Sequence, residues 1–370
     1  MHRDSVEKKG ETLDNPTLDQ DALVDRRQVL SFVGGAIALP FIQTRTQAAE
    51  GQFVLGGWGG AGAAAMLKAW GEPFENGSGL KFAMDGSGPT SGKVRAMVDA
   101  GKTVWDVCDA SIGAAFALGE AGYLEAIDYE IIDRNLVRPD MAYKYAIANY
   151  IFSYSMTVDT SRFGPNQPKN WVDFWNVKDF PGKRVLRASC IGQLEGALMA
   201  DGVPADKIYP IDVKRALNKI REIKEHAIFW KNSAQSEDLF RNKEVVLGNI
   251  WQTSSLALRR EFGDKITFSF DNSVVAPAVW MVPKGNPAGK KVAMEFIKLA
   301  LQPEGQKEFF LRRIGNSPSN PATSALIPDE FKKDDPGQPA NYARQVHLNA
   351  EWYGKYLNEV EAQYIDIISS

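Results

Sequence analysis

FVLGGW (53–58), LKFAMDG (80–86) and VWDVCDAS (104–111) are three short apolar segments with the composition of β-strands. The segments between them, AGAAAMLKAWGEPFE (61–75) and GKVRAMVDAG (92–101), have the length and composition of helices. Strands that alternate with helices in this order predict a parallel sheet with helices on both faces. The first part of the chain therefore predicts an α/β fold.

A second series of strands and helices begins near residue 152 and predicts a second α/β unit. The polar segment at 328–341 is expected to be a loop, and a last helix is expected at the C-terminus. Two α/β units joined by more than one strand form a cleft, which the strand ends and helix N-termini of both units face. The second series has predicted strands at FSYSMTV (152–158), KRVLRAS (183–189), EVVLGNIW (244–251), ITFSF (266–270) and AVWMVP (278–283), and predicted helices at 170–176, 191–202, 210–225 and 287–301.

The length and composition agree with a soluble protein of two lobes. A chain of 370 residues suits two lobes of roughly 150 residues each. We expect residues 50–151 and about 253–308 in lobe 1, and residues 152–252 and about 309–370 in lobe 2. The net charge of −3, with no basic stripe, argues against nucleic acid as a partner.

Residues 1–49 are predicted to be a leader that ends in an export signal. Residues 1–24 are polar and without periodicity, so we expect them to be disordered. Arg26 and Arg27 precede an apolar stretch at 29–42, and small residues follow up to Ala49. This order is typical of a signal peptide, and the arginine pair resembles the twin-arginine signal, although Asp25 replaces the usual Ser or Thr.

The apolar stretch of this leader is also compared with a membrane anchor. At roughly 14 residues it is shorter than the ~20 that span a bilayer. We therefore expect export by the twin-arginine machinery, cleavage near Ala49 and a periplasmic location. Cys108 and Cys190 are the only cysteines. We expect both to be free, because a twin-arginine substrate folds in a reducing compartment, and a disulfide between them is the alternative.

The segment from Gly57 to Gly62 matches the pattern G-x-G-x-x-G, with Asp85 at the end of the next predicted strand. This context also suits a dinucleotide site, so an exported NAD(P)-dependent oxidoreductase is one alternative function. The bulky Trp58 inside the loop argues against a pyrophosphate there. The sequence shows no nucleophile elbow, phosphate-binding loop or metal-ligand spacing, so we expect no catalytic residues, cofactor or metal.

Several longer motifs follow one another in an order that resembles a known family. The chain resembles the extracellular solute-binding proteins of the spermidine/putrescine type, which are receptor subunits of ABC importers. The resemblance covers essentially all of 52–370. It is carried by the segments at 53–60, VWDVCDAS (104–111), NWVDFWNVKDFPGKRVL (170–186), VVLGNIW (245–251) and IGNSPSNPA (314–322).

The resemblance implies a periplasmic-binding-protein-like fold of two α/β lobes, with a hinge and an interlobe ligand cleft. It also implies the membrane subunits of an importer as partners, and we expect a monomer. Core packing is the alternative role of each aromatic residue, and a structural or adhesion protein is the third class of function. The ligand-binding residues that the resemblance implies, with their neighbours, are Trp58, Gly59, Ser111, Phe152, Tyr154, Ser189, Trp230, Trp251 and Gln252.

The charge of the solute can be predicted from the family's polyamine-binding positions, because this chain lacks carboxylates there. Polyamine receptors hold both ends of their ligand with carboxylates, because an unpaired ammonium is costly to desolvate. The corresponding positions here, around Ser189 and Gln252 among others, are not acidic. Asp85, Asp109 and Asp271 could supply one carboxylate between them, and Arg187 could supply a positive charge. We therefore expect a monocation, a zwitterion or an anion with an apolar part.

Overall fold

The structure is a computed structural model that describes residues 51–370. Arg26, Arg27 and the predicted cleavage site near Ala49 lie outside the described residues, so export stays a prediction. Within the described part, no helix is both long and apolar enough to cross a membrane. Cys108 and Cys190 are both buried and free, as expected.

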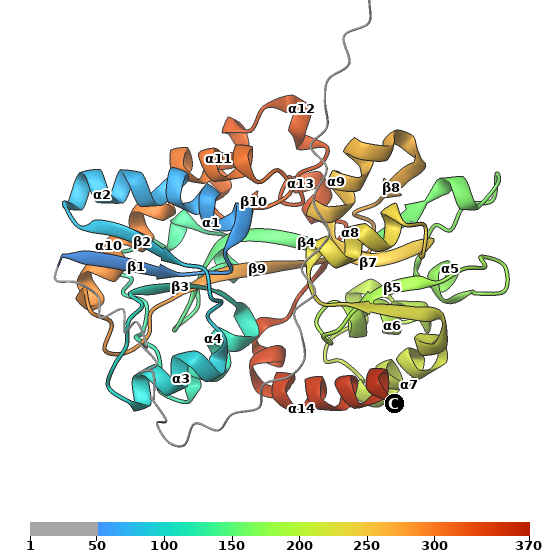
Figure 1. The fold of residues 1–370 in the computed structure, drawn as a ribbon, viewed down its shortest axis with the longest axis horizontal. Helices are drawn as coiled ribbons and strands as arrows, with labels where there is room; N and C mark the ends of the chain where they lie inside the picture. Colours follow the sequence, from blue (N-terminus) through green and yellow to red (C-terminus); the bar gives the residue numbers. More distant parts are fainter. Residues whose placement is uncertain (1–50) are drawn as a thin grey trace, which may run out of the picture. The chain divides into compact units, whose positions relative to one another are not determined.

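One sheet of 11 strands runs through the described part of the chain. Its central path has the order β2–β1–β3–β9–β4–β7–β5–β6 (Figure 1), while β8 and β10 pair with β4, and β11 pairs with β9. The strands are β1 (Gln52–Gly56), β2 (Lys81–Asp85), β3 (Val107–Ser111), β4 (Ile147–Asp159), β5 (Arg184–Arg187), β6 (Ala227–Trp230), β7 (Leu247–Trp251), β8 (Ile266–Phe268), β9 (Val274–Met281), β10 (Ser317–Pro318) and β11 (Val346–His347).

The two ends of this sheet form two α/β lobes. In lobe 1, β1 is parallel to β2 and β3. In lobe 2, β5 is parallel to β6 and β7. Between them, β4 and β9 are antiparallel to each other, and β4 continues into lobe 2, where it pairs with β7. These two crossing strands form the hinge that the resemblance implied.

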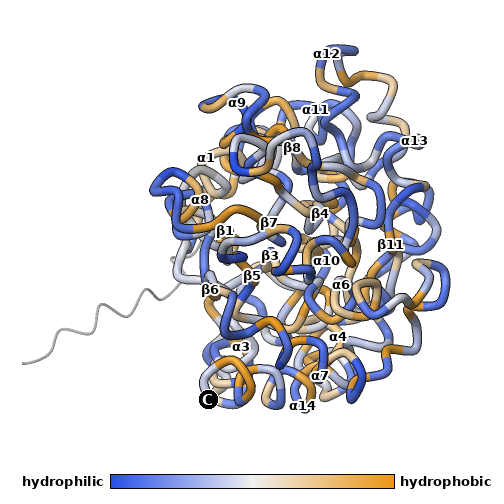
Figure 2. The backbone as a smooth tube through the Cα atoms, turned by 90° about the vertical axis from the view of Figure 1, so that its right-hand side faces the viewer, coloured by the Kyte–Doolittle hydropathy of each residue, from blue (hydrophilic) through white to orange (hydrophobic). Residues whose placement is uncertain are grey.

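Helices cover both faces of each lobe, as Figure 1 shows. In Figure 2 the outer helices carry both hydrophilic and hydrophobic colours, as expected for helices that bury one face. The helices around lobe 1 are α1 (Gly60–Met66), the π-helix Leu67–Gly71, α2 (Glu72–Ser78), α3 (Ser91–Asp99), α4 (Ile112–Glu120), α10 (Gly289–Ala300) and α11 (Pro303–Arg312). Those around lobe 2 are α5 (Trp171–Trp175), α6 (Gln193–Ala200), α7 (Val213–Ile223), α8 (Ser233–Arg241) and α9 (Gln252–Phe262).

The C-terminal helix α14 (Ala350–Ser369) is a third connection between the lobes. It packs against α4 of lobe 1 and α7 of lobe 2, below the sheet in the view of Figure 1. The helix α9, which we expected in lobe 1 with 253–308, packs against β7, β8 and α8 of lobe 2. The helix α11 packs against α1 and the π-helix of lobe 1.

The helix α7 shows how the sequence pattern produces this packing. Apolar residues recur at helical spacing in the predicted helix 210–225, and Ala216, Leu217, Ile220 and Ile223 among them are buried. Val213, on the same predicted face, is half-buried. The Asp212 side chain accepts a hydrogen bond from the Arg215 N–H and begins the helix. This cap therefore pairs one of the free backbone donors of the first turn, while the buried face packs inside lobe 2.

The polar segment at 328–341 is not the loop that the sequence predicted. It contains α12 (Asp329–Lys332) and α13 (Pro339–Tyr342). Pro328 precedes the first of these helices and Pro339 opens the second, and proline at a helix start is pre-organised for that conformation. Helices of four residues are too short to produce a periodic pattern, so the sequence signal was composition alone.

Candidate functional site

The carboxyl ends of β3 in lobe 1 and of β7 in lobe 2 lie beside the hinge strands. In lobe 1, Ser111 at the end of β3 pairs with Ala278 of β9, which also pairs with Tyr150 of β4. In lobe 2, Trp251 at the end of β7 pairs with Tyr154 of β4. The two sets of strand ends are thus separated along β4 by four residues, or about 13 Å of extended chain.

Arg187 ends β5 and lies among aromatic rings at the lobe 2 strand ends. Its guanidinium carbon lies 5.6 Å from the ring centroids of Tyr154 and Trp230, and 5.3 Å from that of Trp251. The two indoles meet edge to face, with centroids 4.9 Å apart. Phe152 contacts both Tyr154 and Trp251 in the same geometry. We call these five residues the Arg187 cluster, and all five were predicted as site residues.

The Arg187 cluster holds a cation without an ion-pair partner and an indole N–H without a hydrogen-bond partner among residues 51–370. The guanidinium donates to the Tyr154 hydroxyl, but Arg187 forms no ion pair with any residue in 51–370. The Trp251 indole N–H is buried and makes no hydrogen bond of normal geometry in that range. Burial raises the pKa of the Tyr154 hydroxyl, and the Arg187 charge opposes that rise. A half-buried cation with an adjacent free N–H is suited to receive an oxyanion.

Trp58 lies on the opposite lobe in a different environment. Its side chain is 58% exposed and lies over the backbone of Gly88, where an added Cβ would come within 3.0 Å of the ring. The Gly57 N–H donates to the Asp85 carbonyl (2.8 Å), and the Gly88 N–H donates to the Gly57 carbonyl (2.9 Å). We call residues 57–60 with 86–88 the Trp58 loop.

Glycine is required where the two halves of the Trp58 loop touch. Gly59 has a φ of 73°, and a Cβ on Gly86 would lie 2.8 Å from the Gly59 Cα. Gly59 of the G-x-G-x-x-G pattern thus lets its loop pack on the next strand-end loop, whereas a Cβ on Gly62 would meet nothing within 4 Å. This packing is a structural reason for Gly59 that requires no dinucleotide.

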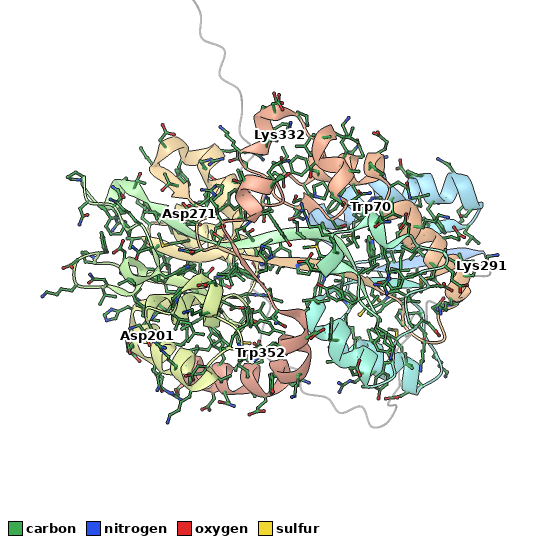
Figure 3. The ribbon with its side chains drawn as sticks, turned by 180° about the vertical axis from the view of Figure 1, so that it is seen from behind. Trp70, Asp201, Asp271, Lys291, Lys332 and Trp352 are labelled. Atoms are coloured by element: carbon green, nitrogen blue, oxygen red, sulfur yellow. The ribbon has the colours of Figure 1, made fainter. Side chains whose placement is uncertain are left out.

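Two of the predicted carboxylates already have partners inside the protein. Asp85 accepts hydrogen bonds from the Trp105 indole (2.8 Å) and the Ser87 N–H (2.8 Å). Burial opposes the ionisation of Asp85, but these hydrogen bonds outweigh it and lower the pKa. Asp271 lies in an exposed turn, labelled in Figure 3, and pairs with Arg344 at 3.0 Å. Neither carboxylate contacts the Arg187 cluster.

The predicted polar residues hydrogen-bond to other parts of the protein. Ser111 caps α4 through a 3.4 Å hydrogen bond from the Ala114 N–H, and the buried Gln252 donates to the Asp334 carbonyl (2.7 Å). Ser189 donates to Glu361 of α14 at 3.2 Å.

Sequence reasoning missed the contribution of α14 to these strand ends. Glu361 contacts the segment that follows β5, and the Tyr364 hydroxyl donates to the Arg187 carbonyl (2.7 Å). Residues 189 and 361 are 172 positions apart, so no local pattern could have joined them.

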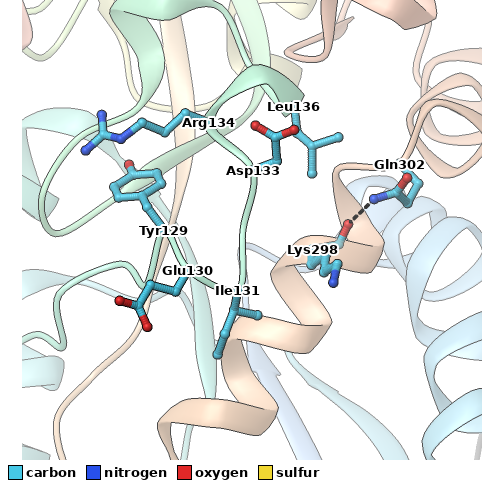
Figure 4. Close-up of a pocket in the computed structure, with 8 residues that line it drawn as sticks. All are labelled: Tyr129, Glu130, Ile131, Asp133, Arg134, Leu136, Lys298 and Gln302. Atoms are coloured by element: carbon cyan, nitrogen blue, oxygen red, sulfur yellow. Dashed lines mark hydrogen bonds between the residues drawn. The ribbon is translucent and has the colours of Figure 1, made fainter.

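A surface pocket lies away from these strand ends, next to α10 (Figure 4). Its lining includes Tyr129, Arg134 and Lys298, but none of the predicted site residues. The Arg134 guanidinium lies 3.7 Å from the centroid of the Tyr129 ring. The side chains of Arg134 and Lys298 are both exposed. Binding sites usually combine an apolar enclosure with convergent polar groups, and the Arg187 cluster meets that description better.

Residues 51–370 contain no group of three side chains suited to a metal ion. Two α/β lobes, two crossing strands and facing strand ends with an aromatic cluster define a two-lobed solute-binding protein.

Known proteins agree with this class. A model of the bacterial extracellular solute-binding proteins matches residues 69–340. A gamma-aminobutyric acid-binding protein of Pseudomonas aeruginosa is 32% identical over 313 residues, which cover 83% of this chain and 88% of that protein.

Solved structures give the same result. A GABA receptor superposes with a TM-score of 0.80 at 31% identity, over 86% of this chain and 97% of the other. An ABC transporter substrate-binding protein from Bradyrhizobium japonicum gives 0.79 at 32%, over 86% and 99%. A binding protein from A. tumefaciens in complex with agropinic acid gives 0.76 at 29%, over 87% and 100%.

The chain belongs to the family of bacterial extracellular solute-binding proteins. The resemblance stated from the sequence is therefore confirmed, and the chain is a solute receptor of an ABC importer. The comparisons favour this function over the dinucleotide-dependent oxidoreductase.

Proposed function

We propose that this receptor captures a small zwitterion of the ω-amino acid class, and that Arg187 binds its carboxylate. The observation that carries the proposal is the half-buried Arg187 guanidinium, which has no carboxylate partner within residues 51–370. A charge removed from water without a partner is unfavourable, and a ligand carboxylate would compensate it. A planar guanidinium also matches a carboxylate through two parallel hydrogen bonds.

The rings around Arg187 suit the rest of such a molecule. Trp230, Trp251 and Phe152 provide apolar faces against which methylene groups can pack. The indole N–H of Trp251 would give the second carboxylate oxygen a donor. Two relatives named for gamma-aminobutyric acid, at 31% and 32% identity, agree with this ligand class.

The proposal includes how the receptor reaches its place of action. The Arg26–Arg27 pair supports export by the twin-arginine machinery, followed by cleavage near Ala49 and action in the periplasm as a non-catalytic monomer. Replacing both arginines with lysine should leave full-length precursor in the cytoplasm. Unchanged secretion of the double variant would show that the pair is not the signal.

Calorimetry with 4-aminobutanoate, butanoate and putrescine tests the ligand class. We expect 4-aminobutanoate to bind and putrescine to bind poorly. Arg187→Gln should weaken binding of the amino acid by about 2–5 kcal/mol, because it removes one partner of a buried charge pair. Arg221→Gln, at an exposed residue of α7 that contacts Asn218, is the control and should change nothing. Submicromolar binding of putrescine, or an unaffected Arg187→Gln variant, would contradict the proposal.

A further inference from the structure

The middle of α14 lies where that helix passes from lobe 1 to lobe 2. Leu357 contacts α4 so closely that a Cβ on Gly113 would lie 2.8 Å from it. Tyr364, two turns further on, donates its hydroxyl hydrogen to the Arg187 carbonyl (2.7 Å). Glu361 lies between them at i+4 and i−3, a spacing that puts all three side chains on one helix face. This face of α14 therefore brings a carboxylate to the junction of the lobes.

Glu361 uses only one of its carboxylate oxygens. Its Oε2 accepts hydrogen bonds from the Cys190 N–H (2.7 Å) and the Ser189 hydroxyl (3.2 Å). Its Oε1 has no hydrogen bond, and its charge has no ion-pair partner, among residues 51–370. An ionised carboxylate offers about four acceptor positions, so Glu361 can receive a further donor. The side chain is half-buried, which makes a cation the favourable donor.

Glu361 and Arg187 border the same turn. Arg187 ends β5, and Ser189, which contacts Glu361, follows it by two residues in the bend after that strand. Tyr364, on the same face of α14 as Glu361, contacts the Arg187 carbonyl. The two opposite charges form no ion pair with each other.

We propose that Glu361 binds the ammonium group of a zwitterionic solute whose carboxylate is held by Arg187. This inference rests on the proposed function and adds the residue that selects for the amine. The family positions for an amine-binding acid are not acidic in this chain, and the C-terminal helix supplies the acid instead. An unsubstituted carboxylic acid would use Arg187 and leave Glu361 unpaired.

The test compares two ligands that differ only in the amine, 4-aminobutanoate and butanoate. Glu361→Gln keeps an acceptor for the Cys190 N–H and removes the charge. We expect this variant to bind 4-aminobutanoate at least tenfold more weakly than the wild-type protein does, and butanoate equally or more tightly. Glu359→Gln on the same helix is the matched control, because Glu359 is exposed and its one side-chain hydrogen bond within residues 51–370 comes from Gln363.

Each outcome separates this inference from the proposed function. An equal loss for both ligands would mean that Glu361 only supports the turn before α6, and a melting curve of the ligand-free variant would show the same defect. No loss for 4-aminobutanoate would also overturn the inference, while a large effect of Arg187→Gln would leave the proposed function standing. If the wild-type protein binds neither ligand, the proposed function fails, and the inference fails with it.

Discussion

The Arg187 cluster and the Trp58 loop both place aromatic side chains at strand ends, but the protein holds them differently. Trp251 packs against Trp230 and Phe152 and lies beside a guanidinium. Trp58 is more than half exposed, and the protein backbone at Gly88 is its close neighbour. The lobe 2 side is therefore pre-organised and charged before a ligand arrives. On the proposed function, we expect the lobe 1 side to gain its contacts only when the lobes close on the solute.

Among the substitutions that test this difference between the lobes, Gly192→Ala should have the largest effect, a loss of stability on the lobe 2 side. Gly192 has a φ of 78°, and a Cβ there would lie 2.6 Å from the Tyr154 ring. Left-handed strain and overpacking together should lower the free energy of unfolding by about 2–4 kcal/mol. Gly202→Ala has a similar φ of 83° but nothing within 4 Å, so it isolates the strain alone. Equal destabilisation of the two variants in urea would show that Tyr154 is loosely held.

Trp251→Ala should have the next largest effect. It removes a packed ring and a free N–H, so we expect binding of 4-aminobutanoate to weaken by about 2–3 kcal/mol and the melting temperature to fall. Trp251→Phe keeps an aromatic ring and should lose only about 1 kcal/mol of binding free energy. A Phe variant as weak as the Ala variant would assign the effect to the N–H and not to packing.

Asp109 differs in charge and burial from Arg187, because strand β3 of lobe 1 buries an acid, whereas lobe 2 holds a half-buried base. Burial raises the pKa of Asp109 to about 7, while a hydrogen bond from the Asn149 amide opposes the rise. A carboxyl whose pKa is raised on folding stabilises the fold at low pH, and that contribution is lost as the pH rises from about 4 through 7.

Asp109→Asn should remove this pH dependence. Relative to wild type, the variant should gain at least about 1.4 kcal/mol of stability between pH 5 and pH 8, the equivalent of one pKa unit. Denaturant titrations of both proteins at the two pH values measure this difference directly. If the difference in stability between the two proteins is the same at both pH values, Asp109 is ionised in the folded protein at both.

The smallest effect is expected for Trp58→Ala. The ring has few protein contacts, so the melting temperature of the ligand-free protein should not change. Binding of 4-aminobutanoate should weaken by about 1 kcal/mol, because the ring contributes only to the closed, ligand-bound form. A large fall in melting temperature would show that Trp58 is a core residue, and the contrast between the lobes would then disappear.

Local sequence patterns predicted most of the fold and one part of the candidate site. Short apolar segments separated by amphipathic ones predicted the parallel strands, and their carboxyl ends carry Trp58, Arg187 and Trp251. These residues could be found because a strand and the residue that follows it are neighbours in sequence. Their roles in binding stay predictions.

The rest depends on contacts between distant segments. Glu361 reaches the turn after β5 only because α14 packs across both lobes, and helix packing of this kind leaves no signal near residue 189. Asp271 looked available as an isolated acid, but it pairs with Arg344, a residue 73 positions away. Whether a charged side chain already has a partner depends on tertiary structure. Sequence alone could therefore not show which of the candidate charged residues remain free for a ligand.

The position of α14 also sets an order of assembly. A growing chain emerges from the ribosome N-terminus first, and its last residues are released only when synthesis ends. The elements of both lobes precede Ala350, so they can fold as they emerge. Of the described elements, the helix that packs against both lobes follows all the others. A chain interrupted just before Ala350 would therefore contain the elements of both lobes but lack the brace between them.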